Sequence, residues 1–195
     1  MMLITHAYAE QVLDNPPAQF SDSVIINYDG DKFYLNLTGL TIRKKLFLKI
    51  YSMAHYIEKN TDVLGSNVSE KDIYNSVLQH RGAKQISMVF MRSLSATQIK
   101  NSLLSGIKSN SDEDEFQQIR PSVEEFTRTI SADVKENDQF VLRWLPNGTL
   151  VSLFQGQQIS AIKDKQFAKV IWSIWFSDKS IVKRERLIEK LLASS

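Results

Sequence analysis

The sequence has no cysteine among its 195 residues. This absence excludes disulfide bonds, thiolate metal sites and cysteine nucleophiles. The chain also lacks a run of about 18 consecutive apolar residues, the length that a membrane-spanning helix needs. Internal repeats and low-complexity linkers are absent as well. With 43% apolar and 24% charged residues, the composition is that of a globular protein, and the length fits one domain with a sizeable core.

Neither sign of charge dominates the sequence. There are 24 lysines and arginines against 22 aspartates and glutamates, which gives a net charge of +2. A nucleic-acid-binding domain needs a concentrated basic face. We therefore expect no nucleic-acid partner.

The usual signatures of enzymes are missing. The three histidines, His6, His55 and His80, have no metal-ligand spacing among them. There is no G-x-S-x-G motif, no phosphate-binding glycine loop and no dinucleotide fingerprint. Glu124 and Glu125 are adjacent on an expected helix, so their side chains point in different directions. We predict no catalytic residue of a standard type, no metal and no cofactor.

The N-terminus allows two interpretations. Ala7-Tyr8-Ala9 has the small-x-small pattern that precedes a signal-peptidase cleavage site, although the residues before it are too few for an apolar signal segment. In the first interpretation it is the tail of a signal peptide, the mature protein starts at Glu10, and the protein is periplasmic or secreted. In the second it is a chance match within an irregular arm over residues 1–22, and the protein is cytoplasmic.

Strand and helix patterns alternate along the rest of the chain. Residues 24–37 read as a β-hairpin around Asp29-Gly30, and one long strand is expected from Arg43 to Ile57. A helix is expected over 69–80 with Ser69 as its cap, a strand over 84–91, and a second helix from Ser95, where Gln98 completes a capping box.

The C-terminal half of the sequence predicts further helices and strands. The acidic run 112–115 suits a helix start better than a calcium loop, and Pro121 breaks or kinks the helix that follows. Three short strands then form a meander with a turn at Pro146-Asn147-Gly148, and two helices are expected over about 164–176 and 180–193. The pattern is that of a single α+β domain over 23–195, with an antiparallel sheet and helices on one side.

The segment Leu37 to Lys59 combines apolar residues with a cluster of cations. In an extended chain, Arg43, Phe47, Tyr51 and Met53 share one face. A guanidinium, a phenol and apolar groups together suit an amphipathic organic anion. However, Arg43 and Tyr51 would lie about 26 Å apart on a regular strand, so a bulge or bend near Lys44-Lys45 is needed. The alternative is a sheet edge whose cations are simply solvated.

Four segments resemble, in order and spacing, the motif blocks of the chalcone isomerase family, in particular its bacterial chalcone-isomerase-like members and the plant fatty-acid-binding branch. Together they cover about residues 24 to 193. The segments are LTGLTIRKKLFLKIYSMAHYI, VFMRSLSATQIKNSLLSGIKSN, DVKENDQFVLRWLPNGTLVSLFQGQQISAI and KQFAKVIWSIWFSDK. The resemblance implies an open-faced β-sandwich, a long antiparallel sheet covered by a layer of helices, with the ligand cleft between them.

The resemblance also implies roles for two residues. Arg43 falls on the family's arginine, which anchors the anion of the ligand. Tyr51 falls where the fatty-acid-binding branch has a tyrosine partner and where true isomerases have a threonine. The family geometry would supply the bend that brings the two together.

Several positions depart from the true isomerases. The active-site tyrosine and asparagine of the second block correspond to Ile99 and Gly106, and a threonine of the fourth block corresponds to Ile174. None of these three side chains can donate a hydrogen bond. The second glycine of the first block is Thr41. Stabilising a developing enolate needs positioned hydrogen-bond donors. The chain therefore keeps the arginine that anchors the anion but lacks the donors that catalysis needs.

We therefore expect a non-catalytic protein that binds a fatty acid or a similar amphipathic anion. One alternative is an isomerase or lyase that uses Arg43 and Tyr51 as electrostatic stabilisers on an unknown small molecule. Another is a protein-interaction module without a small ligand. Besides Arg43 and Tyr51, the candidate ligand-binding residues, each of which also suits plain core packing, are Phe47, Met53, Met88, Phe90, Ile99, Leu103 and Ile107.

Overall fold

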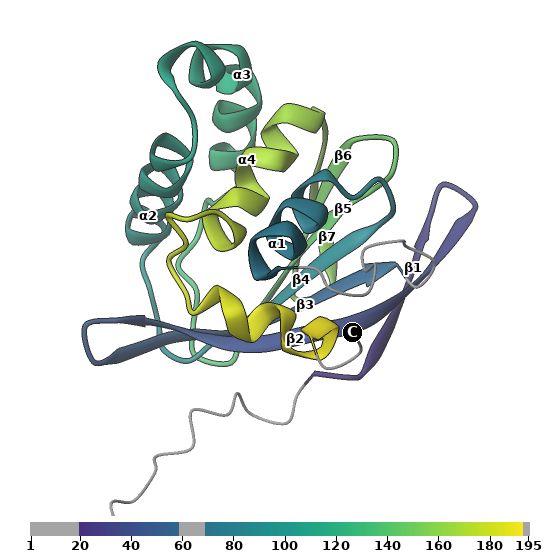
Figure 1. Cartoon of the computed structure of the whole chain (residues 1–195). Helices are drawn as coiled ribbons and strands as arrows, with labels where there is room; N and C mark the ends of the chain where they lie inside the picture. Colours follow the sequence, from purple (N-terminus) through teal and green to yellow (C-terminus); the bar gives the residue numbers. More distant parts are fainter. Residues whose placement is uncertain (1–19, 59–68, 193–195) are drawn as a thin grey trace, which may run out of the picture.

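A seven-stranded antiparallel sheet forms the centre of the molecule (Figure 1). A computed structural model describes residues 20–58 and 69–192. The strand order β1-β2-β3-β4-β5-β6-β7 follows the chain, so each strand pairs with the next. The strands are β1 (Ser23–Tyr28), β2 (Asp31–Lys45), β3 (Leu48–Glu58), β4 (Lys84–Phe90), β5 (Gln139–Trp144), β6 (Thr149–Phe154) and β7 (Gln157–Lys163).

Helices cover one face of this sheet (Figure 1). The helices are α1 (Glu70–Gln79), α2 (Ala96–Ser109), α3 (Glu113–Thr129), α4 (Lys165–Phe176), the 3-10 helix η1 (Arg184–Ile188) and α5 (Glu189–Leu192). The expected caps are confirmed: Ser69 and Ser95 both form capping boxes, and Asp112 caps α3. Pro121 lies inside α3, which continues past it.

Two apolar clusters lie on opposite faces of the sheet. The larger cluster joins the sheet to the helices and includes Met53, Ile107, Trp172 and Phe176. The smaller cluster includes Leu35, Ala54 and Tyr56, which alternate along the strands with residues of the larger one. The predicted α+β architecture, an open-faced sandwich with one layer of helices, is confirmed.

The prediction of one continuous strand from Arg43 to Ile57 is wrong. The chain reverses at Leu46-Phe47, and Lys45 on β2 pairs with Leu48 on β3. Both turn residues are apolar, and apolar residues are not typical of a turn, so the sequence pattern reads through this point. Phe47, which an unbroken strand would place on one face with Arg43 and Tyr51, therefore lies in the turn instead.

The second C-terminal helix also differs from the prediction. Residues 177–183 form no helix, and the helical part begins only at Arg184. The reason is local hydrogen bonding by Ser180, whose hydroxyl donates to the Trp175 carbonyl at 2.7 Å and accepts the Val182 N–H at 3.3 Å. Such bonds compete with a helical start.

A bulge on β2 seats the C-terminal segment on the sheet. The register shifts between Leu37 and Gly39, so Thr38 is skipped in the backbone pairing with β3. The Thr38 hydroxyl lies 2.6 Å from Nδ1 of His55 and donates to the Leu187 carbonyl at 2.7 Å. At Gly39 the backbone of η1 comes so close that a Cβ atom would lie 2.0 Å from the Arg186 carbonyl oxygen. The glycine is therefore required by packing. In Figure 1 the yellow C-terminal segment crosses β2 at this place.

The expected arm over 1–22 and the Ala7-Tyr8-Ala9 motif lie almost entirely outside the described residues, which begin at Phe20. The signal-peptide interpretation and the two cellular locations that depend on it stay predictions.

Candidate functional site

Arg43 and Tyr51 are directly opposite each other on neighbouring strands. The turn at Leu46-Phe47 brings them together, because residues directly opposite in an antiparallel pair have Cβ atoms about 5 Å apart. A register shift between Arg43 and Lys44 adds a bulge beside the pair. The two residues therefore meet as the resemblance implied, through a hairpin and not through a bent strand.

The Arg43 guanidinium has few protein partners. The side chain is half-buried, and its Nη1 donates to the Ile181 carbonyl, which lies between α4 and η1. Of the five N–H donors of a guanidinium, no other has an acceptor, and no carboxylate pairs with Arg43, within residues 20–58 and 69–192. The remaining donors are therefore unpaired among the described residues.

Tyr51 is positioned by α4. Its hydroxyl oxygen accepts the Trp175 Nε1–H at 2.9 Å, and its ring meets Phe90 edge-on at 6.2 Å between centroids. Burial raises the pKa of Tyr51 to about 12, while the Trp175 hydrogen bond and the Arg43 charge act in the opposite direction. The phenol therefore keeps its proton at neutral pH. In the part of the chain that the structure describes, no acceptor takes that proton.

The pair offers two kinds of donor to one anion. A guanidinium recognises a carboxylate with two parallel N–H bonds, and the neighbouring phenol can add an O–H bond. Both groups come from adjacent strands of a hydrogen-bonded sheet, so their spacing is fixed by the register. The arrangement can bind a carboxylate or a similar anion.

Apolar side chains extend from the pair into the core between sheet and helices. Met53 pairs with Met88 across β3 and β4, and both belong to the large cluster with Ile107 of α2. Leu103 is half-buried and packs against the same cluster, as does Tyr51 itself. Phe90 joins them through its contact with Tyr51. Six of the candidate ligand-binding residues thus lie in or against one apolar region.

Two candidate residues lie elsewhere. Phe47 is at the tip of the β2–β3 turn and is 90% exposed, so it does not line the region between sheet and helices. Its prediction rested on an unbroken strand, which the turn removes. Ile99 is half-buried near the start of α2 and is not part of the large cluster.

The positions of the missing isomerase groups are filled by close packing. Gly106 of α2 lies against Ile174 of α4, and a Cβ atom at residue 106 would be 3.1 Å from the Ile174 side chain. Ile174 is buried in the large cluster. The contact leaves no polar group at either position.

Sequence reasoning missed two contributors to the site. Trp175 is not among the predicted site residues, yet its indole N–H donates to the Tyr51 hydroxyl oxygen. The general rule that a buried indole N–H needs an acceptor was the available signal. The Ile181 carbonyl that accepts from Arg43 gave no signal, since any residue type carries a carbonyl.

The described residues contain neither a metal centre nor a membrane-spanning helix. Within 20–58 and 69–192, no three histidine, aspartate or glutamate side chains are grouped to hold a metal ion. Over the same ranges, the helices are too short or too polar to cross a bilayer.

Comparisons with known proteins agree with this architecture. A crystal structure of an Arabidopsis thaliana fatty-acid binding protein has a similar fold, with a TM-score of 0.68 and 15% sequence identity over 89% of this chain and 100% of that chain. At this identity, the likeness shows the fold alone. No curated protein matches the chain significantly. A family model described as chalcone isomerase-like matches residues 19–193. The protein therefore belongs to the chalcone isomerase-like family.

Proposed function

We propose that the protein binds a fatty acid or a similar amphipathic carboxylate without transforming it. The observation that carries this proposal is the Arg43–Tyr51 pair, a half-buried guanidinium without a carboxylate partner among the described residues, opposite a phenol that keeps its proton. The name of the structurally similar Arabidopsis protein, a fatty-acid binding protein, supports the same ligand class.

The apolar region behind the pair suits the tail of such a ligand. Met53 and Met88 are buried and face each other across two strands. Methionine side chains are unbranched and flexible, so they can repack around an acyl chain more easily than branched ones. In this proposal the carboxylate stays with Arg43 while the tail displaces these side chains.

Catalysis of the chalcone isomerase type is disfavoured by the Gly106–Ile174 contact. Closing a flavanone ring requires donors for the phenolate and the enolate, and this contact puts apolar atoms at two of the family's catalytic positions. Incubation of the protein with a chalcone should therefore leave the visible absorbance of the chalcone unchanged. Catalysed loss of that absorbance would favour the isomerase alternative.

Binding can be tested by extracting the purified protein under denaturing conditions and analysing the extract for acyl chains by mass spectrometry. The wild type should release fatty acid, and Arg43→Ala should release little. In a titration of the delipidated protein with palmitate, Arg43→Ala should weaken binding by about 1.5–3 kcal/mol, the range for a hydrogen bond to a charged group. Tyr51→Phe should weaken it by a smaller amount.

Arg120→Ala provides the matched control. It also removes a guanidinium, but from the exposed face of α3, where Arg120 pairs with Glu124. Palmitate affinity should stay at the wild-type value. If Arg43→Ala is folded and binds palmitate with the same affinity as the wild type, the proposed role of Arg43 is contradicted.

A further inference from the structure

The β2–β3 turn departs from the turn chemistry used elsewhere in the chain. Two other hairpins turn through Asp29-Gly30 and Gln155-Gly156, where both residues have positive φ and the second is glycine. In the β2–β3 turn only Leu46 has positive φ, at 58°. A positive φ in a two-residue hairpin turn favours glycine. A leucine with positive φ is uncommon and strained, so the turn is not optimised for folding.

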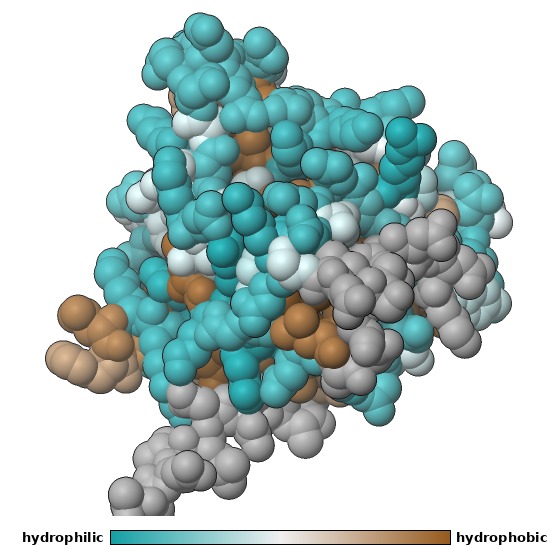
Figure 2. All heavy atoms as spheres, in the orientation of Figure 1, coloured by the Kyte–Doolittle hydropathy of each residue, from teal (hydrophilic) through white to brown (hydrophobic). Residues whose placement is uncertain are grey.

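The same turn exposes large apolar side chains. Leu46 is 81% exposed, Phe47 is 90% exposed and the neighbouring Leu48 is 48% exposed. The β2–β3 hairpin projects from the body of the molecule at the left of Figure 1. At that place Figure 2 shows brown spheres standing out from the largely hydrophilic surface beside them. We name residues 46–48 the apolar tip.

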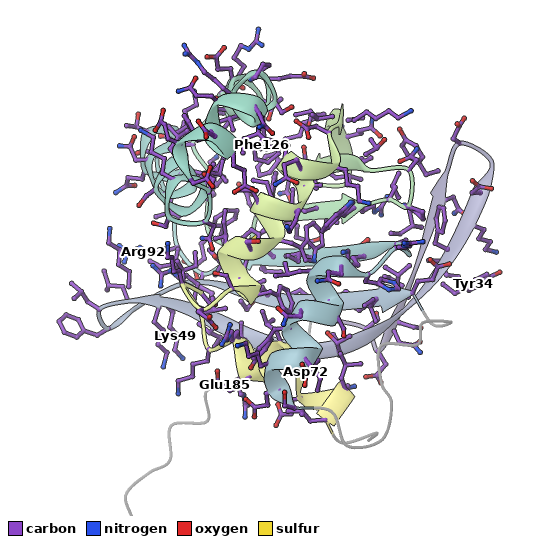
Figure 3. The ribbon with its side chains drawn as sticks, turned by 45° about the horizontal axis from the view of Figure 1, so that its top comes forward. Tyr34, Lys49, Asp72, Arg92, Phe126 and Glu185 are labelled. Atoms are coloured by element: carbon purple, nitrogen blue, oxygen red, sulfur yellow. The ribbon has the colours of Figure 1, made fainter. Side chains whose placement is uncertain are left out.

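Cations surround the apolar tip. Lys45 and Lys49 are both exposed and lie on the two sides of the turn. The sequence contains no aspartate or glutamate between Asp31 and Glu58. Arg92 follows Met91, whose N–H donates to the Ile50 carbonyl, and Figure 3 shows Arg92 and Lys49 on the hairpin side of the molecule. An anionic partner would complement these cations.

We propose that the apolar tip inserts into the interfacial region of an anionic lipid membrane. Leu46 and Phe47 would enter the boundary between head groups and acyl chains, while Lys45 and Lys49 would contact lipid phosphates. A combination of apolar side chains and adjacent lysines binds such surfaces through both apolar burial and charge attraction.

A membrane fits the tip better than a second protein does. A stable protein interface buries about 800 Å² on each partner, and three side chains at the end of a narrow hairpin offer much less. A bilayer needs only a small wedge of apolar side chains with cations at its rim. The strained turn is also explained, since breaches of local folding rules tend to occur at functional sites.

This inference goes beyond the proposed binding of an amphipathic anion and does not depend on it. If both hold, Arg43 lies two residues before the end of β2 at Lys45, or about 7 Å from the start of the turn at the usual rise. The carboxylate anchor would then lie close to the lipid surface on which the hairpin is docked.

The test is co-sedimentation of the full chain with vesicles. Wild type should bind vesicles of equal parts phosphatidylcholine and phosphatidylglycerol about tenfold or more better than pure phosphatidylcholine, and added salt should weaken this binding. The double substitution Leu46→Gly and Phe47→Ser supplies the favoured turn residues, so it should fold and yet lose most of the binding. Phe47→Trp should keep it.

Three further variants separate the possible causes. Lys45→Gln with Lys49→Gln should reduce the preference for anionic vesicles while leaving any binding to neutral ones. Tyr34→Ser is the matched control, because Tyr34 is 53% exposed but lies on the opposite side of the molecule from the tip (Figure 3), and its vesicle binding should equal that of wild type. Tyr51→Phe, which removes a donor of the proposed carboxylate site without changing the charge, should also bind vesicles like the wild type, which separates this proposal from fatty-acid binding.

Two results would overturn the proposal. The first is vesicle binding by the Leu46→Gly, Phe47→Ser variant that equals the wild type. The second is failure of the wild type to bind anionic vesicles at low salt. Sedimentation velocity without lipid completes the experiment, since self-association that the same double substitution abolishes would assign the tip to a second copy of the chain instead.

Discussion

At the scale of single residues, His55 is held by hydrogen bonds at both of its ring nitrogens. It is buried on β3, and its Nε2 accepts the Trp172 indole N–H at 3.3 Å. The proton must therefore be on Nδ1, which lies 2.6 Å from the Thr38 hydroxyl oxygen. The Thr38 hydroxyl oxygen accepts a hydrogen bond from Nδ1–H, and its own O–H donates to the Leu187 carbonyl at 2.7 Å. One neutral tautomer of His55 satisfies the whole chain of hydrogen bonds.

Protonation of His55 would break this arrangement. Burial lowers the pKa of His55 well below its usual value, and the charges of Lys84 and His80 act in the same direction. Lys84 is itself buried, and its Nζ donates to the carbonyls at the end of α1 and lies 3.4 Å from the centre of the Trp144 ring. Burial also lowers the pKa of Lys84 to about 6. Acid would therefore charge both side chains within one apolar core.

We predict that the protein loses stability as the pH falls below about 6.5, the usual pKa of histidine. In this range the unfolded chain binds a proton at residue 55 and the folded chain does not, so acid favours unfolding. Each such proton adds a limiting slope of about 1.4 kcal/mol per pH unit, and His80, whose pKa burial lowers to about 4, adds a second proton with the same sign. Urea unfolding between pH 7.5 and 5 measures it, and the slope should be shallower in His55→Asn. A wild-type stability that rises on acidification would contradict the prediction.

At the scale of elements, the contact of η1 with β2 depends on one small residue. Gly39 has ordinary backbone angles, since it is not among the glycines with positive φ. Secondary-structure preference alone would favour a larger side chain in the middle of a strand. The Arg186 carbonyl at 2.0 Å from a notional Cβ reverses that expectation, because backbone cannot move as cheaply as a side-chain end.

Gly39→Ala should therefore destabilise the fold by about 1–3 kcal/mol, the usual cost of overpacking. The loss should be accompanied by faster hydrogen exchange in η1, which is pushed off the sheet. Gly30→Ala is the control: its Cβ would meet nothing within 4 Å, so its cost comes from positive φ alone and exchange in η1 should stay slow. Unchanged exchange in Gly39→Ala would show that η1 adapts without leaving β2.

The sequence predicted elements wherever their ends carry a local signal. Ser69 and Ser95 are followed three residues later by a residue that closes the box, so both helix starts were correct. The Leu46-Phe47 turn was missed because its residues have the composition of a strand. The C-terminal helix was placed too early because Ser180 binds the backbone around it, a choice set by tertiary packing that periodicity does not record.

For the candidate site, the residue types were predicted but their geometry was not. Arg43 and Tyr51 were identified through the family resemblance, while their separation could not be derived without the turn between them. The hydrogen bond from Trp175 to Tyr51 joins residues 124 positions apart. Contacts over such distances depend on the whole fold, and spacing along the chain carries no information about them.

At the scale of the whole molecule, the segment after α4 packs against the sheet and covers part of its helical face. Ile181 accepts from Arg43, Leu187 accepts from Thr38, and both Leu187 and Ile188 are fully buried in the large cluster. Helix α4 meanwhile supplies Trp172 and Trp175 to β3. The strands β2 and β3 are thus held from one side by the last part of the described chain.

A chain that ends after Ser180 should lose about 3–6 kcal/mol from the burial of Leu187 and Ile188 alone, a large share of the stability of a typical domain. Circular dichroism should show a much lower melting temperature, and the dye ANS should bind to the uncovered sheet face. A chain that ends after Leu192 keeps both residues and should melt like the wild type. Equal melting of the two truncated chains would contradict this account of η1.

Because the chain is synthesised from its N-terminus, the β2–β3 hairpin is made long before the segment after α4 that packs against it. Arg43 and Thr38 leave the ribosome 138 and 149 residues before the carbonyl groups that they bind. At about 5–20 residues per second, translation of that interval takes roughly 7–30 s. During this time the nascent hairpin exposes both its strand face and its leucine-phenylalanine tip. A chaperone or a nearby bilayer therefore has access to this hairpin before the rest of the chain can cover it.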